Sequence, residues 1–340
     1  MNKLNKIGLT ALAGSLAAIA GAHAGALTVS GGSNITYSTE SGTSVGAVAD
    51  TGNPIGWQNN LTFGASGELD NGISWSANAY NSDAQALTSS NITFDMGGMG
   101  KLLVDNGAGG AGLDALDGKL PNAFEEGWDT GAAHGYDTIS GSHGSASLTW
   151  TSPADVLPLG TVVRLAYSPK RDGGSLQADK GNSGNANSLA EDSVDYTIQM
   201  APMDGLSLYI GYAEIGQTGV NDIEEGTYGA NYAMGPVSVG YQKSYESLDK
   251  GVTTTVNYYE NTSWGIAFNV NDNLSVSYAD YESDENLGTA GGQTVDIDSL
   301  QVAYNMGGAT LVLAETDVDG TYYDSGSTNS QTLIAVKLAF

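Results

Sequence analysis

Apolar and polar residues alternate one by one along much of this chain, as expected for β-strands with a single apolar face. The pattern is unbroken at the carboxyl end, where Ile334, Val336, Leu338 and Phe340 share one face and Lys337 belongs to the other. The intervening positions are mostly Ser, Thr, Asn, Gln, Gly and Asp. Similar apolar faces recur within residues 27–37, 57–63, 73–75, 92–96, 148–150, 163–167, 194–200, 206–212, 228–234, 237–241, 264–270, 274–278 and 300–306. These segments predict strands that meet lipid on one side and water on the other.

The connections between these segments fall into two length classes. Short reversals rich in Gly, Pro, Asn and Asp occur at residues 69–72, 97–100, 152–160, 201–205, 235–236, 271–273 and 307–308. Long polar segments span roughly residues 40–54, 81–90, 106–142, 169–192, 214–226, 244–251, 282–293 and 316–330. Short turns at one end and long loops at the other are typical of outer-membrane barrels. The count predicts an all-β, antiparallel transmembrane barrel of 16 strands, and one misread hairpin would change it to 14 or 18.

Composition agrees with a barrel and disagrees with two ordinary hydrophobic cores. The 340 residues include 48 glycines and 18 tyrosines, and the mean hydropathy is -0.17. In a barrel, only every second residue of a strand faces lipid and must be apolar, so the average hydropathy stays near that of a soluble protein. With sixteen strands, the interior is wide enough to leave an aqueous channel.

The amino terminus has the pattern of an export signal. Lys3 and Lys6 precede an apolar run over residues 7–19, and Ala22-His23-Ala24 supplies a small-x-small cleavage site. We therefore expect residues 1–24 to be a signal peptide and residues 25–340 to form the barrel domain. The chain has no cysteine, so no disulfide framework is expected after export.

At this point the chain resembles the general diffusion porins of Gram-negative outer membranes, and among them the trimeric sixteen-stranded porins of alphaproteobacteria. The resemblance rests on the opening strand at residues 25–32, the long third loop and the closing strand that ends at Phe340. It implies location in the bacterial outer membrane, a homotrimer, and contact with the lipid bilayer and lipopolysaccharide. It also implies that the third loop folds into each lumen, and that Thr332, Ile334, Val336, Leu338 and Phe340 form the signal read by the barrel assembly machinery.

The third loop supplies the candidate constriction. Its acids are Asp114, Asp117, Glu125, Glu126 and Asp129. Its one base is Lys119. Related porins carry arginines on the barrel wall opposite such acids. Here the polar face of strands two and three has no arginine and consists of Gln58, Asn60, Ser74, Ser76 and Asn78. Alternation turns three wall bases toward the lumen, Arg164, Lys101 and Lys337, the last two near the periplasmic end. This balance predicts a channel that prefers cations, unless the carboxylates are solvated or face outward.

Charge and motifs exclude several other functions. With 38 acidic and 11 basic residues, the formal charge of -27 disfavours nucleic acid as a partner. Only His134 and His143 would remain after signal removal, and Ser142 beside His143 in sequence does not make a triad. We expect no enzyme activity, no metal site and no cofactor. Acidic groups in other loops could bind Ca2+ but fit solvated surface better: Asp222, Glu224, Glu225, Glu282, Asp284 and Glu285.

Three functions remain open at the level of sequence. The first is a water-filled channel for passive diffusion of small hydrophilic solutes and ions. The second is a substrate-selective channel for sugars or amino acids, in which Phe124 and Trp128 would form a binding slide. The third is a secreted Gly/Asp-rich β structural protein, which should show a Gly-Gly-x-Gly-x-Asp repeat that this chain lacks.

Overall fold

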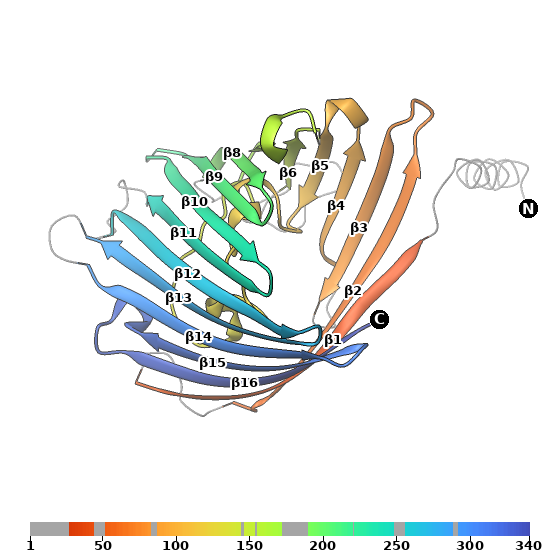
Figure 1. The fold of residues 1–340 in the computed structure, drawn as a ribbon. Helices are drawn as coiled ribbons and strands as arrows, with labels where there is room; N and C mark the ends of the chain where they lie inside the picture. The colour runs from red at the N-terminus through yellow and green to blue at the C-terminus, as the bar shows by residue number, and fades with distance from the viewer. Residues whose placement is uncertain are drawn as a thin grey trace, which may run out of the picture.

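A computed structural model shows sixteen strands that close into one antiparallel barrel (Figure 1). The structure describes residues 27–43, 52–82, 87–143, 146–153, 155–171, 190–219, 221–247, 256–287 and 292–340. Every strand pairs with its neighbours in sequence, and β1 pairs with β16 to complete the ring. The predicted fold class and strand number are therefore confirmed, whereas the expected signal peptide at residues 1–24 lies outside the described residues.

The strands in the first half of the chain are β1 Thr28–Gly42, β2 Ile55–Glu68, β3 Ser74–Ser82, β4 Leu87–Asp95, β5 Lys101–Asn106, β6 Ala146–Thr151, β7 Val162–Ser168 and β8 Ala190–Met203. Those in the second half are β9 Leu206–Gln217, β10 Ile223–Met234, β11 Val237–Ser247, β12 Tyr258–Asn271, β13 Leu274–Asn286, β14 Thr294–Asn305, β15 Ala309–Asp319 and β16 Thr328–Ala339. The described helices are short 3-10 turns: η1 Gly97–Met99, η2 Gly112–Leu116, η3 Gly127–Thr130, η4 Pro158–Gly160 and η5 Thr321–Tyr323. Among the described helices, none has the length and apolar character needed to cross a bilayer.

The junction of the first and last strands shows how alternation sets the two faces. Ile35 lies opposite Val336 and Tyr37 opposite Ile334, and all four belong to the outward face. The backbones of Gly31 and Phe340 exchange two hydrogen bonds, with N–O distances of 2.8 and 3.0 Å. Because a strand's side chains have a period of two, this register places Lys337 and Gln331 on the inward face.

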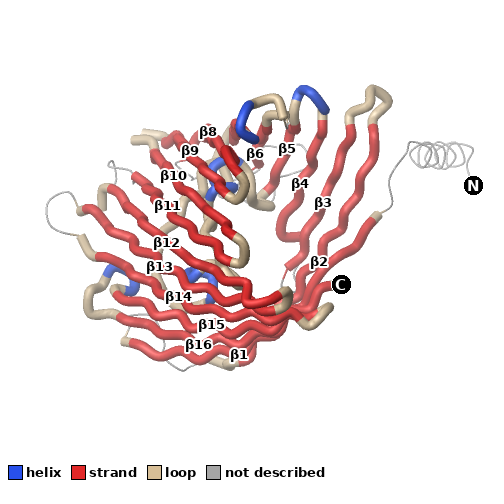
Figure 2. The backbone as a smooth tube through the Cα atoms, in the orientation of Figure 1, coloured by secondary structure: helices blue, strands red, loops and turns tan. Residues whose placement is uncertain are grey.

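The strands continue further into the predicted long loops than the sequence indicated. Glu224 and Glu225 lie in β10, and Glu282, Asp284 and Glu285 lie in β13, so assigning these acids to loops was wrong. Backbone pairing needs no apolar side chains once the strand has left the lipid zone. The backbone hydrogen bonds between strands therefore continue beyond the end of the alternating apolar pattern. Figure 2 shows these strands as continuous segments, with the loops confined to their ends.

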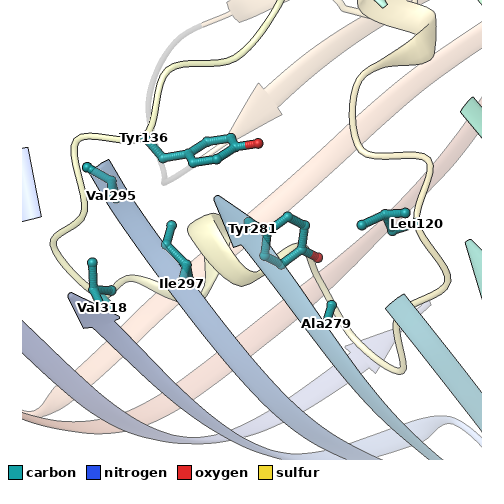
Figure 3. Close-up of a cluster of buried hydrophobic side chains, with 8 residues drawn as sticks. Leu120, Tyr136, Ala279, Tyr281, Val295, Ile297 and Val318 are labelled. Atoms are coloured by element: carbon teal, nitrogen blue, oxygen red, sulfur yellow. The ribbon is translucent and has the colours of Figure 1, made fainter. Parts of the chain in front are cut away.

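The connection between β5 and β6 turns into the barrel, where it packs on the inner wall (Figure 1). We call its described part, residues 107–143, the inner loop. Leu120 and Tyr136 of this loop belong to one buried cluster with Tyr281, Val295 and Ile297 of β13 and β14 (Figure 3). The main apolar core of the molecule therefore lies between loop and wall and not at the centre of a globule.

Candidate channel constriction

The inner loop follows one half of the inner wall through polar contacts with successive strands. Its root is bound by Asp195 of β8 and Glu225 of β10, and the residues just beyond the root, Leu116 and Asp137, by Gln242 of β11 and Asn261 of β12. Its most distant part reaches β14 and β16 through Gln301 and Lys337. The wall formed by β1 to β5 faces the loop across the open part of the lumen.

Two carboxylates of the wall hold the loop's root by accepting backbone hydrogen bonds. Asp195 is fully buried and accepts from the amides of Leu113, at 2.8 Å, and Ser142, at 3.0 Å. Glu225 is 1% exposed and accepts from the amides of Ser140, at 2.6 Å, and Gly141, at 2.7 Å. Sequence reasoning missed Asp195 and described Glu225 as a solvated loop acid, although the inward position of Asp195 between Val194 and Tyr196 was a readable signal.

Aromatic packing fixes the middle of the loop. Trp128 stacks on Tyr136 with ring centroids 5.1 Å apart and meets the edge of Tyr281 at 4.7 Å. Gly127 is needed here because an added Cβ would lie 2.6 Å from the Tyr281 ring. Trp128 is therefore packed against the wall, which fits a structural anchor better than a sugar slide.

The loop's far end contacts β14 and β16. The Gln301 side chain accepts a hydrogen bond from the Phe124 amide at 3.0 Å and donates one to the Glu125 carbonyl at 2.6 Å. The Lys337 ammonium lies 2.8 Å from Glu125 Oε1 and 4.3 Å from the centroid of the Phe124 ring. Phe124 thus has a partner within the protein, and Lys337 contacts the loop in spite of its place near the end of the chain.

The remaining predicted acids occupy different environments along the loop. Asp114 accepts a hydrogen bond from the Gly110 amide at 2.5 Å. Burial, followed by the nearby charges of Asp114 and Glu126, raises the pKa of Asp117 to about 7. Burial also raises the pKa of Glu126 and of Asp129, although the Asp129 side chain remains exposed toward the lumen cavity described below.

The three predicted wall bases do not act together. Arg164 in β7 donates a hydrogen bond to Gln199 of β8. Burial lowers the pKa of Lys119 on the loop, and the positive charge of Arg164 lowers it further. Lys101 forms an exposed ion pair with Asp95 at 3.2 Å, next to the short turn between β4 and β5. Arg164 and Lys337 therefore influence the inner loop, while Lys101 pairs at the turn.

A cavity of about 520 Å³ lies in the lumen between the loop's far end and the adjoining strands β1, β2 and β16. On the loop side it is lined by Phe124, Glu125 and Asp129. The wall side contributes uncharged polar groups and one further acid, from β1, β2 and β16: Asn34, Thr36, Ser38, Glu40, Gln58 and Gln331. Glu40 was missed because it was placed at the edge of a predicted loop, whereas β1 continues to Gly42.

Ser142 and His134 have ordinary structural partners. Ser142 is fully buried and donates to Asp195 at 2.6 Å, and His134 Nδ1 accepts from the Tyr136 amide at 2.8 Å. Within the described ranges, no group of three or more His, Cys, Asp or Glu side chains is arranged to hold a metal ion.

Comparison with known proteins gives consistent similarities. A family model described as Gram-negative porin matches residues 8–324. A search of curated proteins finds no match to this chain. Among solved structures, the chain is similar to a porin refined at high resolution, with a TM-score of 0.64 and 15% identity over 93% of this chain and 100% of that one.

Two further solved structures show the same fold. The trimer form of OmpT from Vibrio cholerae has a TM-score of 0.66 at 11% identity, covering 94% of this chain and 100% of that one. An anion-selective porin from Comamonas acidovorans has a TM-score of 0.63 at 14% identity, covering 93% and 99%. At such identities the likeness carries the fold alone.

Proposed function

Because the chain belongs to the Gram-negative porin family, we propose that it forms a water-filled outer-membrane channel that passes small hydrophilic solutes and prefers cations. Family and fold make it a channel of the outer membrane and not an enzyme. The preference for cations goes beyond them. One observation carries it, namely an acidic loop held inside the barrel against the wall opposite β1 to β5.

The balance of charge in the lumen supports cation preference. Among the described residues, Glu126, Asp129 and Glu40 form no ion pair with a base, although the charge of Lys119 acts on Glu126, whereas Glu125 is paired with Lys337. Strands β1 to β4 contain no Lys or Arg at all. A narrow opening with low-dielectric walls focuses the field of fixed charges, so uncompensated carboxylates raise the local concentration of cations.

The fold by itself does not decide the sign of selectivity. The structurally similar Comamonas acidovorans porin is described as anion-selective. In a barrel of given shape, the sign follows from which charges line the narrowest part. The side chains of this chain, and not its likeness to other barrels, therefore support the proposal.

Reversal potentials in a salt gradient across a planar bilayer test the proposal. We expect potassium to be preferred over chloride, and the triple variant Glu125→Gln, Glu126→Gln, Asp129→Asn to lose much of that preference. A matched variant, Glu214→Gln with Glu224→Gln, removes exposed acids from the outward side of β9 and β10 and should change it little. Chloride preference in the unmodified protein, or equal losses in both variants, would refute the assignment.

We also propose that the protein is exported by a cleaved signal peptide, is assembled by the barrel assembly machinery and forms a homotrimer beside lipopolysaccharide. The family resemblance supports this, and the similar Vibrio cholerae protein is described in a trimer form. Amino-terminal sequencing of envelope-extracted protein should give a start near Gly25. Light scattering in detergent should give three times the mass of one chain, and a monomer in native extracts would contradict the trimer.

A further inference from the structure

We propose that Gln301 is a positioning residue for ion selectivity: it fixes the inner loop so that Glu125 stays paired with Lys337 and masks its charge from passing ions. The inference rests on the proposed channel function and deepens it. It gives control over one base of the wall to a neutral side chain that lies buried beneath the loop.

The side-chain amide of Gln301 is fully used by its hydrogen bonds. Gln301 lies on the inward face of β14 and is only 1% exposed. Its Oε1 accepts from the amides of Phe124, at 3.0 Å, and Glu125, at 3.3 Å. Its Nε2 donates to the Glu125 carbonyl at 2.6 Å and to Ser299 Oγ at 3.0 Å. Because a glutamine amide offers two donors and two acceptor positions, Gln301 holds the peptide groups on both sides of Glu125.

Neighbouring wall residues form a seat for residues 122–125, which we call the loop tip. Ser277 of β13 lies opposite Gln301 in the sheet and accepts from the Ala123 amide at 2.8 Å. Ala123 and Phe124 also pack on three small buried residues of β14, β15 and β16: Ala303, Val312 and Ala335. Apolar packing is not directional, so it presses the tip to the wall without fixing its place there. The hydrogen bonds of Gln301 and Ser277 supply that direction.

The place of Glu125 decides whether Lys337 acts as a free charge. The Glu125 carboxylate lies 2.8 Å from the Lys337 ammonium, beside the lumen cavity that Glu125 lines. Their side chains are 34% and 42% exposed. An ion pair exposed to this extent contributes little by itself, so it depends on the backbone that presents Glu125. That backbone is the part of the loop tip that Gln301 holds.

Releasing the loop tip should therefore unmask a positive charge. Lys337 stays in place because β16 is paired with β15 and β1, whereas Glu125 moves with the loop. An unpaired ammonium in the lumen repels cations and attracts anions. The ratio of cation to anion permeability should fall about threefold, which is the Boltzmann factor for one unit charge about 7 Å away in water.

Reversal potentials of the variant Gln301→Met in a potassium chloride gradient test the proposal. Methionine fills a similar volume without the hydrogen bonds, and we expect the threefold fall. Adding Lys337→Met should restore the cation preference, because the unmasked charge is then absent. A merely structural role of Gln301 would not be rescued in this way. Gln217→Met, at the outer end of β9, is the matched control and should leave the ratio unchanged.

Acylation of Lys337 gives a second readout that does not depend on selectivity. With a water-soluble acylating reagent and mass spectrometry, Lys337 should react faster in Gln301→Met than in the unmodified protein. Lys101, at the turn between β4 and β5, is the internal reference and should react at the same rate in both.

The outcomes separate this role of Gln301 from the channel function. An unchanged permeability ratio with unchanged Lys337 reactivity in Gln301→Met overturns the proposal, and so does a fall that persists in the Lys337→Met background. Chloride preference in the unmodified protein refutes the proposed function alone, since Lys337 reactivity still decides whether Gln301 positions Glu125. If Gln301→Met yields no barrel, the shorter amide of Gln301→Asn is judged by the same outcomes.

Discussion

At the scale of single residues, Asp117 shows how position changes the chemistry of a carboxyl group. It lies in the inner loop beside a small cavity that is also lined by Trp128, Tyr136 and Gln242. Burial and the charges of Asp114 and Glu126 raise its pKa to about 7. At neutral pH this acid is therefore only partly ionised, and its contribution to the field in the lumen depends on pH.

Asp117 should make the folded channel less stable as pH rises. Its pKa in the folded state lies above the unfolded value, so between about pH 4 and pH 7 the folded state binds more protons and loses stability as they leave. The full loss is on the order of 4 kcal/mol. Urea unfolding of detergent-solubilised protein from pH 4.5 to 8.5 should show this decline, and Asp117→Asn should flatten it. Asp70→Asn, in the turn between β2 and β3, is the control, and an equal slope in both variants would contradict the assignment.

At the scale of elements, the inner loop depends on the strands that receive it. Asp195 of β8 accepts hydrogen bonds from amides at both ends of the loop. Leu113 lies near the loop's beginning, and Ser142 lies near its end. One buried carboxylate thus fixes two segments that are otherwise separate. A loop held in this way keeps its acids at defined positions in the lumen.

Replacing Asp195 should loosen the loop without opening the barrel. Asp195→Ala leaves buried amides without an acceptor, which costs about 3 kcal/mol of the loop's local stability. We expect protease cleavage within residues 107–143 at least tenfold faster, and noisier single-channel current. Asp192→Ala, an exposed acid on the same strand, is the matched control. Cleavage at the rate of the unmodified protein would show that the other contacts hold the loop without Asp195.

The last strand closes the barrel, so its final residue has a structural role besides any recognition signal. Phe340 exchanges two backbone hydrogen bonds with Gly31, at 2.8 and 3.0 Å. Deleting Phe340 should reduce the yield of heat-modifiable barrel about thirtyfold, since two net hydrogen bonds of roughly 1 kcal/mol each are lost at the closure. Phe340→Trp keeps the backbone and an aromatic side chain and should fold normally. Full yield from the deletion would contradict both roles.

Local patterns predicted some elements better than others. The turns at Asn71-Gly72 and Gly235-Pro236 were readable because their residues suit a tight reversal. Strands β5 and β15 were predicted only as intervals between turns. The outward face of β5 consists of Leu102 and Val104, and that of β15 includes Leu311 and Leu313. A short apolar face of two residues gives too few positions for the period to stand out.

At the scale of the whole molecule, the inner loop divides the lumen into two parts. It covers the wall from β8 to β16, and the wall of β1 to β5 remains across the open passage. The aromatic residues Phe124 and Trp128 are both engaged with protein partners. Where described residues line it, the passage is thus bounded mainly by small polar groups and acids, without a continuous row of aromatic faces.

Neutral sugars should therefore pass according to size and without saturation. In liposome swelling assays we expect rates to fall steadily from a triose to a trisaccharide, and no sugar to block the current at millimolar concentration. A single sugar that saturates or blocks, while larger ones do not, would favour the substrate-selective channel. The variant Trp128→Phe serves as a control, because it keeps an aromatic ring packed on Tyr136.

The sequence by itself determined the local features of this porin: its alternating faces, the chemistry of its turns, sixteen strands and the excess of acids in the third loop. These features depend on neighbours in the chain and on the two solvents that a strand must face. Only the tertiary structure decided where the loop lies, that Asp195 and Glu225 hold it, that Lys337 neutralises Glu125, and that Glu40 faces Asp129 across a shared cavity. Glu125 and Lys337 are 212 residues apart, and closure of the barrel is what brings such distant groups together.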